Sequence, residues 1–433
     1  MINFFHTADI HLGVENYGKI DQKTGNHSRL LDFKDSFEQC IDLAIEKDID
    51  FFLFCGDAYK TAFPTPTHQK ILMQLFFKLQ KAKIPVVIVV GNHDHPLSFG
   101  KVNSLDLFKE LPLEGFHVFS KPDILKLKTQ NGEIQIVGIP WPTRNNVITS
   151  EKHYFKSSKE ITSYLSQAIG EIIKTLSEKL DPKIPAILAG HLTVSSGVFS
   201  GSEKCAVFGN DPIFLPSQLA IKPFDYIALG HLHRFQNLNT KGYPAVVYSG
   251  SVERVDFGER KEEKGFCFVK IEDKKEPYER TNFEFIPLKT RPMIQIEIKL
   301  ETGKNQTEQI LEEIEKHDIK GAIVKIIYHI PEEKTDKVDL QKIQKACSDA
   351  MHLVSITPVR KLVIREKRAN LNIDMNIDTL LEKYFETKSY SEDKKINLLQ
   401  KAKTLYLQIN EKEDTCEDLI PKKPDLIQQE NVL

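Results

Sequence analysis

Two stretches of the chain are built on one pattern: Phe51-Phe52-Leu53-Phe54-Cys55-Gly56-Asp57 and Val86-Val87-Ile88-Val89-Val90-Gly91-Asn92-His93. In each, an uninterrupted apolar run is followed by a glycine and then by side chains that can bind a metal ion. Such short apolar runs predict strands covered on both faces, as in parallel sheets packed between helices. The glycine permits a sharp exit from the strand. The pattern therefore predicts an α/β protein whose polar residues gather at strand ends.

Further segments of the same kind extend this pattern to about residue 275. Apolar runs predict four more strands, at 134–139, 186–189, 226–229 and 245–248. Apolar residues at helical spacing predict amphipathic helices around 30–45, 71–79 and 161–176. Thr65 and Pro66 are typical of a helix start, as the capping residue and the first-turn proline. Strands that alternate with helices in this way favour an α/β layout.

The N-terminal Ile2-Asn3-Phe4-Phe5 is also strand-like. Ligand-type side chains follow five of the predicted strands, this one included: Asp9, His11, Asp57, Asn92, His93, His191, His231 and His233. Each one alone has an ordinary explanation as a turn or a capping residue. Five strands that each end in Asp, Asn or His are a much stronger signal, because the carboxyl ends of strands form the ligand crevice of such sheets. We therefore expect these side chains to meet at one sheet edge.

The chemistry of these side chains selects a class of metal. Imidazoles, carboxylates and one amide oxygen, without a thiolate, suit manganese, iron or zinc in a catalytic site rather than a structural zinc site. There are too many ligands for one ion. Two ions about 3.5–4 Å apart that share a carboxylate would use them all and would clamp a phosphoryl group.

The same residues carry a resemblance to a known family. Asp9-Ile10-His11, Gly56-Asp57, Gly91-Asn92-His93-Asp94, Gly190-His191 and Gly230-His231-Leu232-His233 resemble the five ordered motifs of calcineurin-like metallophosphoesterases. Within that superfamily the chain resembles the SbcD nuclease family, chiefly through Gly250-Ser251-Val252-Glu253-Arg254-Val255-Asp256-Phe257-Gly258. The resemblance covers residues 1 to about 270.

The resemblance implies a role for each residue. Asp9, His11 and His233 would hold one ion, Asn92, His191 and His231 the other, and Asp57 would bridge them. His93 would protonate the leaving oxygen or stabilise the developing charge. The implied activity is the two-metal hydrolysis of phosphodiester bonds, with exonuclease and endonuclease action on DNA ends and hairpins. The two divalent ions are expected to be manganese.

One position departs from the family pattern. SbcD-like proteins usually have an Asp or His where this chain has Lys60, close to the counterpart of His93. A cation there would not orient the imidazole as a carboxylate does, and it could depress the pKa of the histidine. Alternatively, Lys60 turns outward or contacts a DNA phosphate.

Residues 17–29 form a polar, basic loop beside the first motif. The resemblance implies that this loop touches the DNA backbone, with Lys19, Lys23 and Arg29 as phosphate contacts. An equally weighted alternative is a loop whose charges simply face water. In the family, the helix after Thr65 and the segment 103–108 form a homodimer interface. Leu72, Phe76 and Phe77 are candidates for it, although a core role is favoured for most of them.

The fold class predicted for the whole chain is a two-sheet metallophosphoesterase sandwich flanked by helices, followed by a small α+β capping domain and C-terminal helices. The expected boundaries are 1–275 for the nuclease domain and 285–370 for the capping, DNA-recognition domain. Residues 375–411 would be a helical segment that binds a coiled-coil ATPase of the SbcC type. Residues 412–433 are polar and are expected to be a disordered tail.

The composition sets further limits. The net charge of −2 rules out a global positive field, so DNA binding would depend on local basic patches and on the ions. The six cysteines have no paired spacing, which favours a reducing compartment. Neither a signal peptide nor a membrane span is expected. The chain is thus expected to be cytoplasmic, associated with the nucleoid.

Two rival functions deserve comparison. A small-molecule or cyclic-nucleotide phosphodiesterase would need neither the capping domain nor the partner-binding helices. A catalytically silent interaction scaffold would have no reason to keep seven metal ligands, and only Lys60 favours that interpretation.

Overall fold

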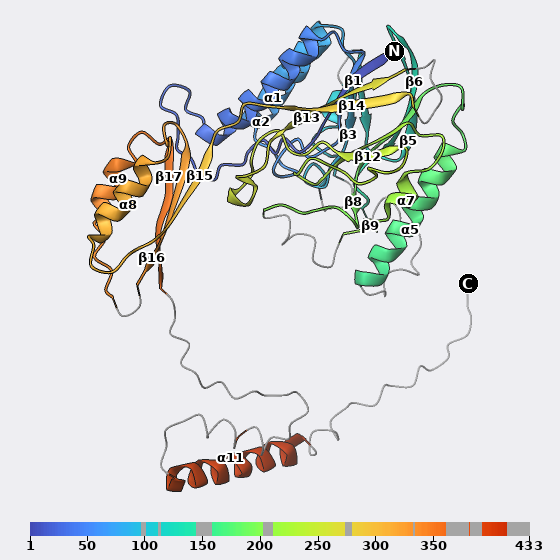
Figure 1. Cartoon of the computed structure of the whole chain (residues 1–433). Helices are drawn as coiled ribbons and strands as arrows, with labels where there is room; N and C mark the ends of the chain where they lie inside the picture. Colours follow the sequence, from blue (N-terminus) through green and yellow to red (C-terminus); the bar gives the residue numbers. More distant parts are fainter. Residues whose placement is uncertain are drawn as a thin grey trace, which may run out of the picture. The chain divides into compact units, whose positions relative to one another are not determined.

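The computed structural model describes residues 1–96, 101–110, 114–143, 158–201, 211–272, 279–331, 334–360, 381 and 392–413. They belong to two compact units, Met1–Arg360 and Lys361–Leu433 (Figure 1). In the second unit the structure describes one long helix, α11 (Glu392–Glu413). Most of the expected partner-binding segment outside α11, and nearly all of the expected tail 412–433, lie outside the described residues.

The first unit contains two six-stranded sheets. The first sheet has the order β14-β13-β1-β2-β3-β4, with β14 (Thr281–Pro287), β13 (Gly265–Ile271), β1 (Ile2–Thr7), β2 (Phe51–Phe54), β3 (Val86–Val89) and β4 (Phe116–Phe119). Strands β1 to β4 are parallel to one another, whereas β13 and β14 are antiparallel to their neighbours. Helices α1 (Ser28–Glu46), α2 (Pro66–Lys81) and α3 (Leu107–Glu110) contribute to the core on its outer face.

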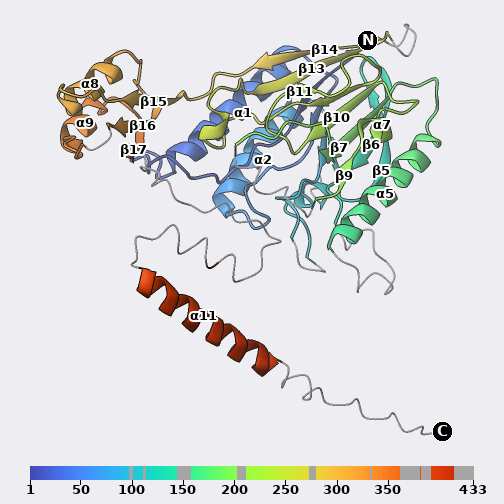
Figure 2. The same cartoon turned by 60° about the horizontal axis from the view of Figure 1, so that its bottom comes forward.

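The second sheet has the order β11-β12-β10-β7-β6-β5, with β11 (Gln236–Asn237), β12 (Ala245–Tyr248), β10 (Tyr226–Gly230), β7 (Ala186–His191), β6 (Gly132–Ile139) and β5 (Asp123–Thr129). Helix α5 (Ser158–Ser177) runs along its outer side, near the short helix α7 (Pro216–Leu219) (Figure 2). The short strands β8 (Thr193–Val194) and β9 (Ile213–Phe214) form a separate pair, and a 3-10 turn spans Phe257–Glu259.

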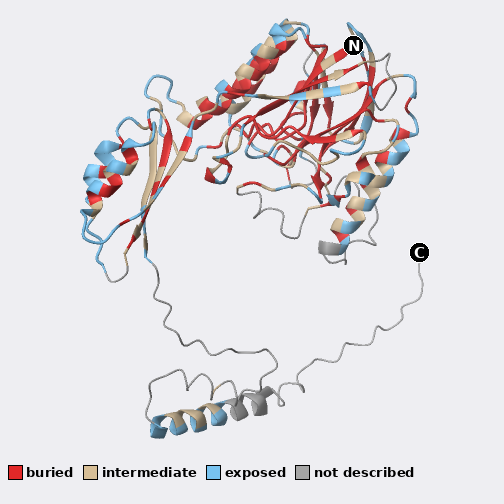
Figure 3. Ribbon diagram, in the orientation of Figure 1, coloured by how far each residue is buried: buried red, intermediate tan, exposed pale blue. Residues whose placement is uncertain are grey.

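Alternate residues of the central strands enter different cores, which explains their unbroken hydrophobicity. Phe52 and Phe54 pack with the residues of α1 and α2, whereas Phe51 and Leu53 pack between the two sheets. A third core joins the second sheet to α5. The central strands are therefore buried on both faces (Figure 3). The predicted two-sheet sandwich flanked by helices is confirmed.

The first sheet extends past the domain boundary expected near residue 275. Strand β14 pairs along its whole length with β13, so the first sheet continues to Pro287. Residue 275 therefore falls between two neighbouring strands of one sheet rather than at the end of a core.

A small lobe follows, which we call the cap (residues 293–360). Its parallel sheet has the order β15-β16-β17, with β15 (Met293–Lys299), β16 (Ile323–Ile330) and β17 (His352–Arg360). Helices α8 (Gln306–Glu315) and α9 (Leu340–Ala346) share a separate hydrophobic core with this sheet. Helix α9 ends at Ala346, a few residues before the chain enters β17 at His352. The remainder of the expected capping domain, 361–370, lies outside the described residues.

Arg291 fastens the cap to the sandwich. Its guanidinium donates to both carboxylate oxygens of Asp32 on α1, with Nε 2.9 and 2.8 Å away, and to the carbonyl of Gly321 in the cap at 2.7 Å. Arg29 donates to the same carboxylate at 2.8 Å.

In the part of the chain that the structure describes, we find no helix long and apolar enough to cross a membrane.

Candidate metal centre

The predicted ligands come together from the ends of strands in both sheets. Asp9 and His11 follow β1, Asp57 follows β2, and Asn92 follows β3, all in the first sheet. His191 ends β7, and His231 and His233 follow β10, in the second sheet. The expectation of a single sheet edge is therefore corrected, because the side chains converge across the sandwich.

The backbone carries strain at four of these residues. Asp9, His11 and Asp57 have φ values of 55°, 51° and 58°, and His231 has a φ of 106°. Such values are uncommon for residues with a side chain and cost on the order of 1–3 kcal/mol each. Hydrogen bonds between the strand exits hold this conformation, including Asp9 N to the Gly56 carbonyl at 2.9 Å and His11 N to the Asp57 carbonyl at 3.0 Å. The conformation aims the side chains inward.

Asp9, His11 and His233 form the first group of possible ligands, with ligand atoms all within 4.8 Å of one another. The Nε2 atoms of His11 and His233 lie only 2.9 Å apart. All three residues are buried. Two imidazoles that point their Nε2 atoms at one spot, beside a carboxylate, are the arrangement expected around a cation.

Asp57, His191 and His231 form the second group. Nε2 of His191 lies 3.4 Å from Asp57 Oδ2 and 2.9 Å from Oδ1 of Asn92, which is also 3.2 Å from Nδ1 of His231. Nε2 of His231 is buried and, among the described residues, lacks a hydrogen-bond partner, with Asp211 3.7 Å away. Asp57 also approaches Nε2 of His11, at 3.7 Å. The chemistry of this donor set fits two cations with one shared carboxylate.

The protonation states suit metal ligands at most of these positions. Burial lowers the pKa of His11 well below its usual value and lowers that of His231 to about 3, which leaves both rings neutral. Burial alone would raise the pKa of Asp57, but the facing imidazoles of His191 and His93 hold it well below its usual range. Neutral imidazoles and ionised carboxylates are the metal-binding forms.

Two groups carry protons that a cation would replace. Burial raises the pKa of Asp9 to about 7. Burial favours the neutral ring of His191, but the Asp57 carboxylate outweighs it and raises the pKa of His191 to about 9. Metal binding at such sites releases protons.

His93 is exposed and lies at the mouth of this cluster. Its backbone N–H donates to Oδ1 of Asp57 at 2.9 Å, and its ring Nδ1 lies 2.8 Å from the backbone carbonyl of Lys60. Thus the main chain of Lys60, rather than its side chain, orients the imidazole. The Lys60 side chain is exposed, in keeping with the outward-turned alternative.

Sequence reasoning gave no role to two buried carboxylates that support the centre. Asp94 accepts from the backbone N–H groups of Asp57, Ala58, Tyr59 and Gly91 at 2.8–3.3 Å, and so ties two strand exits together. Glu259 contacts Nδ1 of His233 at 2.8 Å. Asp94 was already part of the third motif, and Glu259 directly follows the SbcD-like string, so adjacency to those motifs was the available signal.

The four residues expected to contact DNA differ in exposure. Lys19, Lys23 and Lys60 are exposed. Arg29 is fully buried and pairs with Asp32 and the Arg254 carbonyl, so the expectation that it contacts DNA is wrong. Arg29 lies in the first turn of α1, and its guanidinium is also 4.0 Å from the buried carboxylate of Glu253.

The three candidate dimer residues on α2 also differ in exposure. Leu72 and Phe76 are fully buried in the core beneath α2 and are not available to a partner. Phe77 is partly exposed. The core role favoured for most of these residues is therefore confirmed for two of them.

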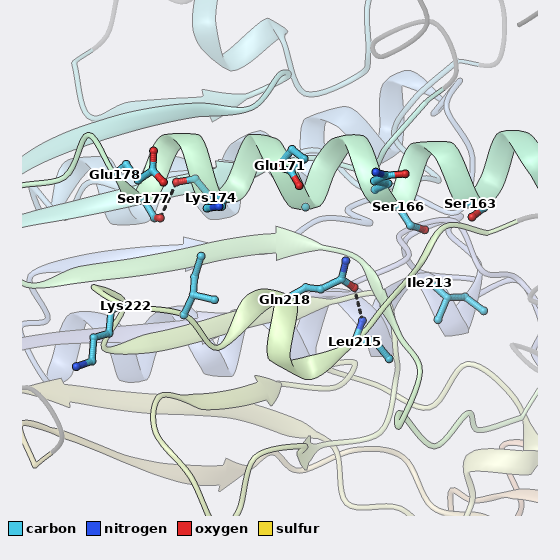
Figure 4. A pocket seen from close by; sticks show the side chains of 13 residues that line it. Ser163, Ser166, Glu171, Lys174, Ser177, Glu178, Ile213, Leu215, Gln218 and Lys222 are labelled. Atoms are coloured by element: carbon cyan, nitrogen blue, oxygen red, sulfur yellow. Dashed lines mark hydrogen bonds between the residues drawn. The ribbon is translucent and has the colours of Figure 1, made fainter.

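Trp141 and a separate groove complete the surroundings. The Trp141 ring lies over His231, with ring centroids 4.9 Å apart, so it packs beside the second ligand group. A groove of about 680 Å³ lies between α5 and the β9–α7 segment (Figure 4). Its lining among the described residues includes Ser166, Glu171 and Gln218 but none of the predicted site residues.

Two comparisons with known proteins identify a family. The model of the calcineurin-like phosphoesterase family matches residues 2–235. A curated protein, the SbcD subunit of the nuclease SbcCD from Staphylococcus epidermidis, is 30% identical over 301 residues, which cover 68% of this chain and 71% of that protein.

Among solved structures, a dimetal phosphatase from Danio rerio is 12% identical, with a TM-score of 0.39, over 62% of this chain and 92% of the other. The TT1561 protein of Thermus thermophilus is 13% identical, with a TM-score of 0.37, over 66% and 98%. The family assignment rests on the first two matches. The chain belongs to the calcineurin-like phosphoesterase family and, within it, to the SbcD family.

Proposed function

We propose that this phosphoester hydrolase cuts DNA by a two-metal mechanism. The observation that carries the proposal is the position of Asp57, whose carboxylate lies 3.4 Å from Nε2 of His191 in the second group and 3.7 Å from Nε2 of His11 in the first. Asp9, His11 and His233 would hold the first ion, and Asn92, His191 and His231 the second. When bound, the ions lower the pKa of water and neutralise charge on the phosphate. The absence of a thiolate from the set favours manganese.

His93 is the proposed catalytic acid. The Lys60 carbonyl can only accept, so Nδ1 of His93 carries a hydrogen and Nε2 is the nitrogen that takes up or releases the transferred proton. The ring is exposed at the mouth of the centre, where a leaving oxygen can reach it. A proton delivered there would neutralise the charge that develops on the leaving group.

DNA is the substrate that the surroundings favour. The name of the Staphylococcus relative, which identifies it as part of the nuclease SbcCD, supports a nuclease. The exposed lysines Lys19 and Lys23 lie on the loop that follows the first motif and suit phosphate contacts. A cap with its own core would be superfluous for a cyclic nucleotide, which supports the nuclease over a small-molecule phosphodiesterase.

Two partners belong to the proposal. An ATPase of the SbcC type would bind the C-terminal helices within 375–411, which include most of α11. A second copy of the chain would bind at α2 and the segment 103–108, where Phe63, just before α2, and Leu107, in α3, are 66% and 52% exposed. Exposed apolar side chains that gather in one patch mark interfaces.

The test is cleavage of linear duplex DNA with manganese, magnesium or a chelator. The protein is compared with Asp57→Ala, which removes the shared ligand, and His93→Ala, which spares the ligands. We expect no cleavage with chelator or with Asp57→Ala, and a loss of about 10²–10⁴-fold with His93→Ala. His317→Ala, on the surface of the cap, is the control and should cleave normally. Cleavage that ignores the chelator and both site variants would refute the proposal.

A further inference from the structure

A carboxylate holds the ring of His233 from the side opposite the candidate metal position. Oε1 of Glu259 lies 2.8 Å from Nδ1 of His233. An ionised carboxylate oxygen only accepts, so Nδ1 carries the hydrogen. The lone pair therefore lies on Nε2, which faces Nε2 of His11 at 2.9 Å. This is the tautomer that a metal ligand needs at that position.

Glu259 is itself fixed by contacts that lead back to His233. Its Oε2 accepts from Nζ of Lys264 at 2.8 Å and from the backbone N–H of Val255 at 3.0 Å. The same Lys264 ammonium donates to the backbone carbonyl of His233 at 2.9 Å. Glu259 and Lys264 are 0% and 1% exposed. One lysine thus ties the backbone of His233 to the carboxylate that orients its ring.

Two other histidines of the centre are oriented by backbone carbonyls instead. Nδ1 of His191 contacts the carbonyl of Cys55 at 2.7 Å, and Nδ1 of His93 contacts the carbonyl of Lys60 at 2.8 Å. A carboxylate is a stronger acceptor than a neutral carbonyl, so it makes the imidazole a better electron donor. Among these ligands, the ring of His233 is therefore held by a stronger acceptor than the ring of His191.

Stability alone is a poor explanation for this ion pair. Removing two charges from water costs about as much free energy as their attraction returns, so a buried pair contributes little net stability. A pair that abuts a ligand ring can instead act through that ring.

We propose that Glu259, held in place by Lys264, is a positioning residue for His233 and makes the Asp9–His11–His233 site the tighter of the two ion sites. The inference rests on the proposed two-ion function. It predicts an order of filling in which this site takes up Mn²⁺ first.

The test is calorimetric titration of the metal-free, full-length protein with Mn²⁺. Glu259→Gln should weaken the tighter site by about 10–100-fold, the usual effect of losing such a partner, and leave the weaker site unchanged. Asn92→Ala removes a ligand from the second site only. If only the weaker affinity falls in this variant, the tighter site is the Asp9–His11–His233 site. Glu262→Gln is the matched control, because Glu262 contacts Lys264 at 3.0 Å without reaching His233, and both affinities should stay unchanged.

A second variant guards against misfolding. Glu259→Gln with Lys264→Met removes both buried charges together, so neither is left unpaired, and the same selective loss is expected. Equal weakening of both sites, or no change in either, would overturn the inference. Failure of the proposed function would look different. The unmodified protein would then not bind two Mn²⁺ ions, or the Mn²⁺ titration of Asp57→Asn would match that of the unmodified protein.

Discussion

At the scale of single residues, the strand exits leave no room beside Asp57. A Cβ atom built on Gly91 would lie 2.2 Å from Oδ1 and 2.4 Å from the backbone nitrogen of Asp57. One built on Gly56, whose φ is +93°, would lie 2.4 Å from Nδ1 of His191. These glycines therefore let two exits approach closely enough for one carboxylate to serve both ligand groups.

Gly91→Ala should consequently disable metal binding. The added methyl group must displace Asp57, so we expect Mn²⁺ stoichiometry in equilibrium dialysis to fall from two ions toward none. Gly170→Ala is the control, because the nearest atom there is the end of the flexible Gln218 side chain at 3.2 Å. That variant should keep both ions and gain helix stability slightly. Full occupancy in Gly91→Ala would contradict the assignment of Asp57 as the shared ligand.

At the scale of elements, the loop between β1 and α1 presents its lysines from a braced backbone. Ile20 pairs with His27 across the loop, and Asp21 accepts from Thr24 at 2.8 Å. Lys19 and Lys23 extend from this frame into solvent. An ordered loop loses less entropy on contact with DNA than a floppy one.

Each phosphate contact adds to the salt dependence of DNA affinity. If Lys19 and Lys23 each neutralise one phosphate, replacing both with Gln should reduce the slope of log K against log salt by about 1.8, or about 0.9 per contact. Fluorescence anisotropy with duplex DNA at several salt concentrations measures this slope. Lys241→Gln, on the exposed turn after β11, should leave it unchanged. An unaltered slope in the double variant would favour the alternative of a merely solvated loop.

The link to the cap depends on Arg291. Its guanidinium bonds Asp32 on α1 and Gly321 in the cap, so it joins the two cores directly. Arg291→Met should lower the free energy of unfolding by about 2 kcal/mol, the range for hydrogen bonds to charged groups. Faster amide hydrogen exchange is expected around residues 288–293.

Urea unfolding and exchange mass spectrometry measure these effects. Lys289→Met is the matched control, because the side chain of Lys289 is exposed and only its backbone is hydrogen-bonded to Gln39. Exchange around residues 288–293 that stays as slow as in the unmodified protein would show that the cap is held by other contacts, such as the small cluster of Phe257, Met293 and Ile323.

At the scale of the whole molecule, the chain divides into two units, and the candidate centre lies in the first. The first unit, Met1–Arg360, contains all eight predicted site residues. Deleting residues 372–433 should therefore abolish co-purification with an SbcC-type ATPase while nuclease activity on short DNA ends persists. Deleting only 414–433, which spares α11, should preserve binding. If the ATPase still co-purifies after the larger deletion, the proposed interface is wrong.

Local patterns were enough to predict most of the central strands of both sheets and the start of α2. Continuous apolar runs such as 51–55 identify doubly covered strands, because only burial on both faces permits such a sequence. The start of α2 was predicted by Thr65, whose side chain accepts from the N–H of His68 at 3.4 Å. The hairpin of β13 and β14 was missed, because a charged connection and a domain boundary share one composition.

By itself, the sequence determined which residues are available to bind metal and that they follow strands. Both are properties of neighbouring residues and of periodicity. Only the tertiary structure decided that the ligands come from two sheets, that Asp57 faces imidazoles of both ligand groups, that Arg29 is buried, and that Glu259 contacts Nδ1 of His233. These facts join residues that lie far apart in the chain. They depend on the packing of one sheet against the other and on the paths of the loops, which no local pattern encodes.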